Sequence, residues 1–97
     1  MRLEDITIVI TTFKSDKKIN LCIESIDKEV KVIIVENSQN EKLKENIEKK
    51  YSNVHCIIAK ENLGYARGNN LGLKKVNTKY ALVLNPDTIL ETDALKN

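Results

Sequence analysis

The stretch Ile6-Thr7-Ile8-Val9-Ile10-Thr11-Thr12 decides the fold class, because every residue in it is β-branched. Such a run, with no regular polar alternation, is typical of a strand that is buried on both faces of a parallel sheet. Residues 30–35, 54–59 and 80–84 form three similar apolar runs. We therefore expect four strands, and we expect the last of them to be buried like the first.

The segments between these runs predict helices. Four apolar residues recur at the spacing of one helical face: Ile19, Cys22, Ile23 and Ile26. Ser15 or Asp16 can cap that helix, and Asn40 can cap a second helix over 41–50. A third helix is expected from about residue 65 to 76. The alternation of strand and helix predicts an α/β fold, a Rossmann-like three-layer βαβ sandwich with a mostly parallel four-stranded sheet.

Composition narrows the class of protein. The chain has 97 residues, enough for one domain, and a net charge of +2, which is too small to argue for nucleic acid. No stretch approaches the roughly 20 apolar residues of a membrane span. Cys22 and Cys56 form no CxxC motif and are expected to be reduced, buried filler, and His55 is expected to be structural. We therefore expect a cytoplasmic protein.

Polar clusters follow each expected strand. These are Thr11-Thr12-Phe13, Glu36-Asn37-Ser38, Lys60-Glu61-Asn62 and Asn85-Pro86-Asp87. In parallel α/β sheets, ligands bind beyond the carboxyl ends of the strands. We therefore expect the four clusters to meet on one edge of the sheet.

Two of these clusters each allow two interpretations. Glu36 could accept hydrogen bonds from a sugar hydroxyl or a base N–H, or it could belong to an ordinary turn with Asn37 and Ser38. In Asn85-Pro86-Asp87, the proline ends the strand and directs Asp87 outward. That carboxylate could hold Mg²⁺ or Mn²⁺ together with substrate phosphates, although the same tripeptide is also a common turn.

The segment 62–70 carries two glycines and two adjacent asparagines. Gly68 and Gly72 lie four positions apart and would let a helix approach the sheet closely. The helix start and Arg67 would suit a phosphate, whereas a packing helix that tolerates glycine is the alternative. The segment is neither GxGxxG nor a Walker A loop, which disfavours a dinucleotide-binding fold and a P-loop ATPase.

Four motifs in order then show a family resemblance: ITIVITTFKS, VIIVENSQ, ENLGYARGNNLGL and ALVLNPDTIL. The chain resembles the N-terminal part of family 2 glycosyltransferases of the GT-A fold, in particular the rhamnosyltransferase-like branch. The resemblance implies a nucleotide-sugar-binding portion over residues 1–97. It also implies a UDP- or dTDP-sugar donor, a glycan or lipid-linked acceptor, and a role in cell-surface polysaccharide synthesis, with the protein lying in the cytoplasm or at the inner membrane face.

The same resemblance implies roles for individual residues. Thr11 and Phe13 would flank the base, and Glu36 would contact the base or ribose. The donor would also lie near Asn62, Arg67 and Asn69. Asp87 would bind the metal, while Asn85 stands where the family usually has the first aspartate of a DxD element.

Members of this family usually continue well beyond the last motif. We therefore expect residues 1–97 to be a truncated donor-binding portion that lacks the acceptor site and the catalytic base, and that has no turnover alone. An unpaired sheet edge and exposed apolar surface would favour self-association.

Two other classes fit the sequence less well. A sugar-phosphate nucleotidyltransferase would carry a glycine-rich loop after the first strand, where this chain has Thr11-Thr12-Phe13-Lys14-Ser15. A non-catalytic receiver-like βα module would need an acidic pair there and an aspartate after the third strand. Neither pattern is present.

Overall fold

The computed structural model describes residues 2–95, and within them the chain alternates strand and helix as expected. The elements in order are η1 (Leu3–Asp5), β1 (Ile6–Thr12), α1 (Asp16–Glu24), β2 (Lys31–Glu36), α2 (Glu41–Lys50), β3 (Val54–Ile58), α3 (Gly64–Leu73) and β4 (Tyr80–Leu84). In this part of the chain, no helix is long and apolar enough to cross a membrane.

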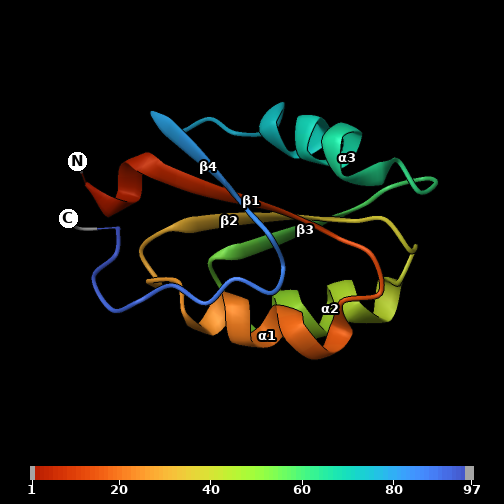
Figure 1. Cartoon of the computed structure of the whole chain (residues 1–97), viewed down its shortest axis with the longest axis horizontal. Helices are drawn as coiled ribbons and strands as arrows, with labels where there is room; N and C mark the ends of the chain where they lie inside the picture. The colour runs from red at the N-terminus through yellow and green to blue at the C-terminus, as the bar shows by residue number, and fades with distance from the viewer. Residues whose placement is uncertain (1, 96–97) are drawn as a thin grey trace.

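The described strands form a parallel sheet in the order β3-β2-β1-β4. Helices α1 and α2 cover one face, and α3 covers the other, which gives three layers (Figure 1). Every residue of β1 is buried, because this central strand lies between the two helical layers. The Rossmann-like sandwich predicted from the sequence is confirmed.

The helices form where their apolar spacing predicts. Residues Ile19, Cys22, Ile23 and Ile26 are all buried against the sheet. The Asn40 side chain caps α2 by accepting a hydrogen bond from the Leu43 amide. Ser15 occupies the N-cap position of α1, but its side chain makes no capping bond.

Helix α3 approaches the sheet closely because of its glycines. A Cβ placed on Gly72 would lie 2.5 Å from Cγ1 of Val9, and one on Gly68 would lie 2.6 Å from Cγ2 of Thr11. Real side chains do not tolerate such distances, so both positions require a residue without a Cβ. The predicted close approach is confirmed, and α3 ends at Leu73, earlier than expected.

The expectation that the fourth strand is buried is wrong. Residues Tyr80 to Val83 are exposed and Leu84 is half-buried. Among the described residues, β4 pairs only with β1, so one edge of it is open. This edge strand is apolar throughout, as a central strand would be, so its composition did not distinguish the two positions.

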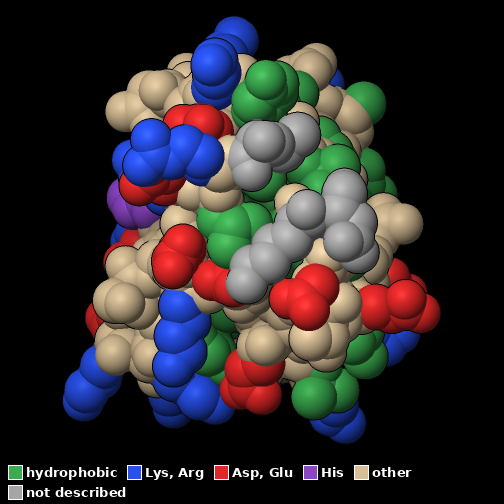
Figure 2. Space-filling view, turned by 90° about the vertical axis from the view of Figure 1, so that its left-hand side faces the viewer, with side chains coloured by type: hydrophobic (Ala, Val, Ile, Leu, Met, Phe, Trp, Pro, Cys, Tyr) green, Lys and Arg blue, Asp and Glu red, His purple; other side chains and the backbone are tan. Residues whose placement is uncertain are grey.

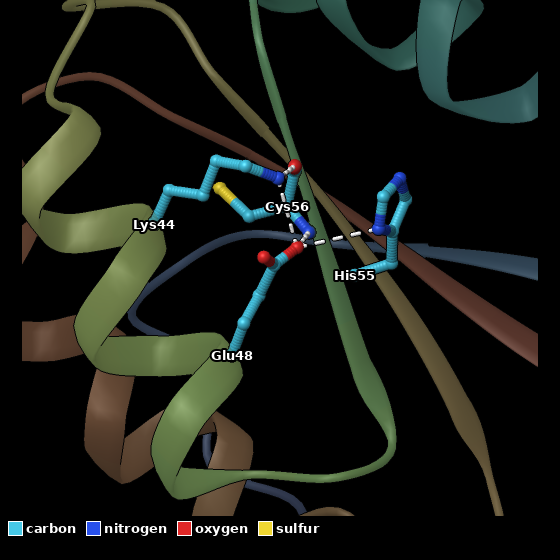
Figure 3. Close-up of polar contacts among 4 residues, drawn as sticks. All are labelled: Lys44, Glu48, His55 and Cys56. Atoms are coloured by element: carbon cyan, nitrogen blue, oxygen red, sulfur yellow. Dashed lines mark hydrogen bonds and ion pairs between the residues drawn. The ribbon is translucent and has the colours of Figure 1, made fainter.

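The opposite edge of the sheet is shielded by side chains of α2. Lys44 Nζ donates to the Cys56 carbonyl at 2.5 Å, and the Cys56 amide donates to Glu48 Oε2 at 2.7 Å (Figure 3). His55 Nδ1 lies 3.3 Å from the same carboxylate oxygen. The outward backbone groups of β3 are therefore occupied at this residue, which protects an edge strand from pairing with another chain.

Charged side chains are mixed on the face near the chain termini. Figure 2 shows acidic and basic side chains interspersed there, with hydrophobic side chains between them. This mixture matches the low net charge of +2 and offers no single-sign surface for a polyanion on this face.

Candidate nucleotide-sugar site

A cleft of about 770 Å³ lies at the carboxyl ends of β1 and β4. These neighbouring strands form the topological switch point of the sheet, because the chain passes from β1 to β2 on one side and returns to β4 on the other. Ligands in open α/β sheets bind at this point. The cleft is lined by Phe13, Lys14, Ser15, Asp16, Lys17, Lys18, Tyr65, Asn85, Pro86 and Asp87.

The corner Asn85-Pro86-Asp87 forms the β4 side of the cleft. Pro86 is buried, and the Thr88 amide closes a turn by donating to the Asn85 carbonyl at 3.0 Å. This turn leaves the Asp87 carboxylate exposed at the cleft. The tripeptide is therefore a turn, and this turn places the Asp87 carboxylate where it could also hold a metal ion.

Cys22 of α1 lies beneath this corner. Its thiol donates a weak hydrogen bond to the Asn85 carbonyl, with 3.8 Å between sulfur and oxygen. Burial, together with the smaller effect of the negative charge of Asp87, raises the pKa of the Cys22 thiol to about 11. The thiol is therefore neutral at pH 7 and serves as packing, as the sequence predicts.

Two aromatic rings line the same cleft. Phe13 follows β1 and is 39% exposed, and Tyr65 lies in the first turn of α3 and is 53% exposed. Lys14 Nζ lies 5.3 Å from the centroid of the Phe13 ring. Exposed rings at a concave site can stack on a planar ligand such as a nucleoside base.

Other residues expected at the site lie behind or beside the cleft. Thr11 is buried, and its hydroxyl donates a 2.6 Å hydrogen bond to Asn69 Oδ1. Asn62 Oδ1 accepts a hydrogen bond from the Gly64 amide and so shapes the start of α3. Arg67 is exposed on α3 and is not among the residues that line the cleft.

Glu36 is fully buried and holds the turn between β2 and α2 together. Its carboxylate accepts hydrogen bonds from the Ser38 amide at 3.0 Å, the Asn40 amide at 2.8 Å and the Ser38 hydroxyl at 2.6 Å. The Thr12 hydroxyl donates a longer bond of 3.4 Å. The sequence allowed a ligand contact or a turn residue, and the observed contacts are those of a turn residue.

Asn37, which the sequence indicates only as a turn residue, also joins two elements of the fold. It is 2% exposed, its Nδ2 donates to the Gly64 carbonyl at 3.1 Å, and its Oδ1 accepts from the Leu63 amide at 3.4 Å. It thereby fastens the end of β2 to the start of α3. No local pattern reveals this role, because its partners lie 26 and 27 positions away.

Several residues of the cleft are not among those that the sequence predicted. Lys14, Lys17 and Lys18 line it, as does Tyr65. The lysines could have been predicted from the sequence, because they follow the first strand at the edge of the sheet where ligands bind. The start of α3 was also expected at this edge, but only the tertiary structure shows that Tyr65 lines the cleft at the switch point.

Two solved structures illustrate the similarity of this fold to known proteins. One is TarS from S. aureus (residues 1–349), with a TM-score of 0.79 and 22% identity over 94% of this chain and 30% of that chain. Another is the mannosyltransferase PcManGT from Pyrobaculum calidifontis, in complex with GDP-Man and Mn²⁺. It has a TM-score of 0.84 and 14% identity over 96% of this chain and 30% of that chain. These likenesses show that the chain has part of the GT-A fold.

Sequence comparison identifies the family. The family model described as glycosyl transferase family 2 matches residues 7–97, so the chain belongs to that family. A relative from Haloferax volcanii, the low-salt glycan biosynthesis hexosyltransferase Agl10, is 29% identical over 97% of this chain and 31% of its own length. The teichoic acid poly(glycerol phosphate) polymerase of Staphylococcus epidermidis is 31% identical over 96% of this chain and 14% of its own. The chain thus spans less than a third of either relative.

Proposed function

We propose that residues 1–97 are the donor-binding part of a glycosyltransferase that takes a sugar from a UDP- or dTDP-sugar. The cleft at the switch point between β1 and β4 is the observation that carries this proposal. Membership of family 2 supports the reaction class and disfavours the nucleotidyltransferase and receiver-like alternatives.

The proposed base site uses the two aromatic rings of the cleft. Phe13 and Tyr65 lie on its wall and can stack on a pyrimidine. Thr11, Asn69 and Glu36 then act by positioning, since their polar groups hold β1, α3 and the β2–α2 turn in place. We also propose that Asn62 and Arg67 contact the donor. Glu36 can contact it as well only by releasing one of the hydrogen bonds that hold its turn.

The donor set of the cleft fits a divalent ion that arrives with phosphates. Residues 2–95 contain no group of three His, Cys, Asp or Glu side chains that could hold an ion by themselves. Mg²⁺ and Mn²⁺ accept one carboxylate together with phosphate oxygens and water, and Asp87 with the Asn85 amide oxygen offers such a set. When bound, the ion would stabilise negative charge on the leaving diphosphate. The Mn²⁺ in the PcManGT complex supports this assignment.

We assign to this chain binding and orientation of the donor, and no proton transfer. Because it spans less than a third of its relatives, we propose that the acceptor site and the catalytic base belong to the remaining part of a longer enzyme. The proposed acceptor is a glycan or lipid-linked molecule. The proposed compartment is the cytoplasm, with contact at the inner membrane face, in keeping with two free, buried cysteines.

The open edge of β4 suggests self-association of residues 1–97. Tyr80, Leu82 and Val83 of this edge strand are 45%, 38% and 42% exposed. The shielded backbone of β3 makes the β4 edge the better surface for pairing. We propose that a second copy covers it.

Calorimetric titration with UDP, dTDP and GDP, each with and without Mn²⁺, tests the donor proposal. We expect tighter binding of UDP or dTDP than of GDP, and an increase of affinity with Mn²⁺ that is lost in Asp87→Asn. Asp93→Asn is the control outside the cleft. Failure of all three nucleotides to bind the folded wild type would contradict the proposal, and an unchanged Mn²⁺ effect in Asp87→Asn would remove the metal role from Asp87.

A further inference from the structure

The cleft carries a cluster of lysines that the metal proposal does not use. Lys14 lies in the β1–α1 loop, and Lys17 and Lys18 lie in the first turn of α1. Building on the proposed function, we propose that these three lysines bind the diphosphate of the nucleotide sugar directly, so that the site retains affinity for nucleoside diphosphates without a metal ion.

The ammonium groups of these lysines are available for a ligand. None of the three lies within 4.0 Å of a carboxylate in residues 2–95, whereas Lys44 and Lys50 are paired with Glu48 and Glu24. The ammonium group of Lys14 lies over the ring of Phe13. An anion entering the cleft therefore gains new ion pairs without breaking existing ones.

The backbone of the loop fixes where this charge lies. Lys14 adopts a φ of 54°, in the left-handed region that residues with a side chain rarely occupy. The Ser15 hydroxyl donates to the Phe13 carbonyl across this residue at 3.4 Å. The Lys14 ammonium group is thus held over Phe13, next to the ring that we propose stacks on the base.

The charge balance of the cleft favours an anion. Three lysines face two aspartates, Asp16 and Asp87, on the lining. Asp16 Oδ2 accepts a hydrogen bond from Asn40 Nδ2 at 2.9 Å, which engages that carboxylate with α2. Asp87 is then the one carboxylate of the lining left for a metal ion, and a single carboxylate binds such an ion weakly. The lysines attract a diphosphate whether or not an ion is present.

The test is a titration of uridine, UMP and UDP in EDTA and again in Mn²⁺. Two triple variants are compared with wild type: Lys14→Gln/Lys17→Gln/Lys18→Gln in the cleft and Lys28→Gln/Lys49→Gln/Lys74→Gln outside it. The control removes the same charge from exposed positions. Thermal unfolding followed by circular dichroism establishes that each variant is folded.

In EDTA, we expect wild type to bind UDP more tightly than UMP, and UMP more tightly than uridine. The cleft variant should lose roughly tenfold in UDP affinity and nothing in uridine affinity, whereas the control variant should lose much less. Added NaCl should weaken UDP binding to wild type more than to the cleft variant.

Two results would overturn the inference. If UDP binds wild type only with Mn²⁺, or if the two triple variants lose affinity equally, the lysines do not form a diphosphate site, and the donor proposal still stands on Asp87. If no nucleotide binds folded wild type under either condition, the donor proposal fails and this inference fails with it.

Discussion

The Thr11 hydroxyl donates a 2.6 Å hydrogen bond to Oδ1 of Asn69, which joins the central strand to α3 across 58 positions of the chain. Gly68 packs on the same threonine, because a Cβ there would meet its Cγ2 at 2.6 Å. Two residues that the family resemblance places near the donor thus bind one another. They fix the helix whose first turn carries Tyr65 to the cleft.

Replacing Gly68 by alanine should destabilise the protein. The buried Thr11 is β-branched and hydrogen-bonded, so it cannot move aside easily, and we expect a loss of about 1–3 kcal/mol in the free energy of unfolding. Urea unfolding measures this. Asn70→Ala adds no such contact at an exposed position of α3 and should change stability by no more than about 0.5 kcal/mol. Equal stability of the two variants would show that α3 can shift away from the sheet.

Glu36→Gln should weaken the turn after β2 without any ligand present. The amide keeps the size of the side chain but offers one oxygen where the carboxylate offers two to the Ser38 and Asn40 groups. We expect a loss of about 1–3 kcal/mol and faster hydrogen exchange at the amides of Ser38 and Asn40. Glu61→Gln, in an exposed loop, is the control. Unchanged exchange at both amides would show that Glu36 does not hold this turn and would contradict its role as a turn residue.

Glu48 should make stability depend on pH in the acid range. The hydrogen bond from the Cys56 amide, opposed by burial and aided by Lys44, lowers the pKa of this carboxyl below its usual value of 4.5. A lowered pKa in the folded state means that the contribution is present above pH 4.5 and is lost as pH falls through the folded value.

Chemical denaturation between about pH 6 and 3 should therefore show a smaller loss of stability in Glu48→Gln than in wild type. Glu45→Gln, exposed on the same helix, should retain the wild-type dependence. Parallel curves for wild type and Glu48→Gln would mean that the contact drawn in Figure 3 does not contribute to stability.

Val83→Lys should reduce self-association. A charged side chain on the open β4 strand opposes pairing with a second copy. Sedimentation velocity over a wide concentration range should show mass rising with concentration in wild type and a monomer in this variant. Leu21→Lys introduces the same charge at a residue that is 58% exposed on α1, and it should behave as wild type. Wild type at monomer mass throughout the range would exclude the proposed dimer.

The sequence by itself determined the layers and the order of the elements. The apolar runs predicted the strands, and the apolar spacing predicted the buried face of α1, because both patterns follow from local geometry. The spacing of Gly68 and Gly72 also predicted the close approach of α3. The exposure of β4 was missed because an apolar strand has the same composition at a sheet edge as at its centre.

The tertiary structure decided which polar residues share a site. Strand order places Phe13 beside Asn85 and Asp87 at the switch point, and it brings Tyr65 to the same cleft from the other face of the sheet. It also engages Glu36 and Asn37 in the turns around β2. Sequence spacing cannot specify such encounters, because they depend on which strands pair and on where buried donors find their acceptors.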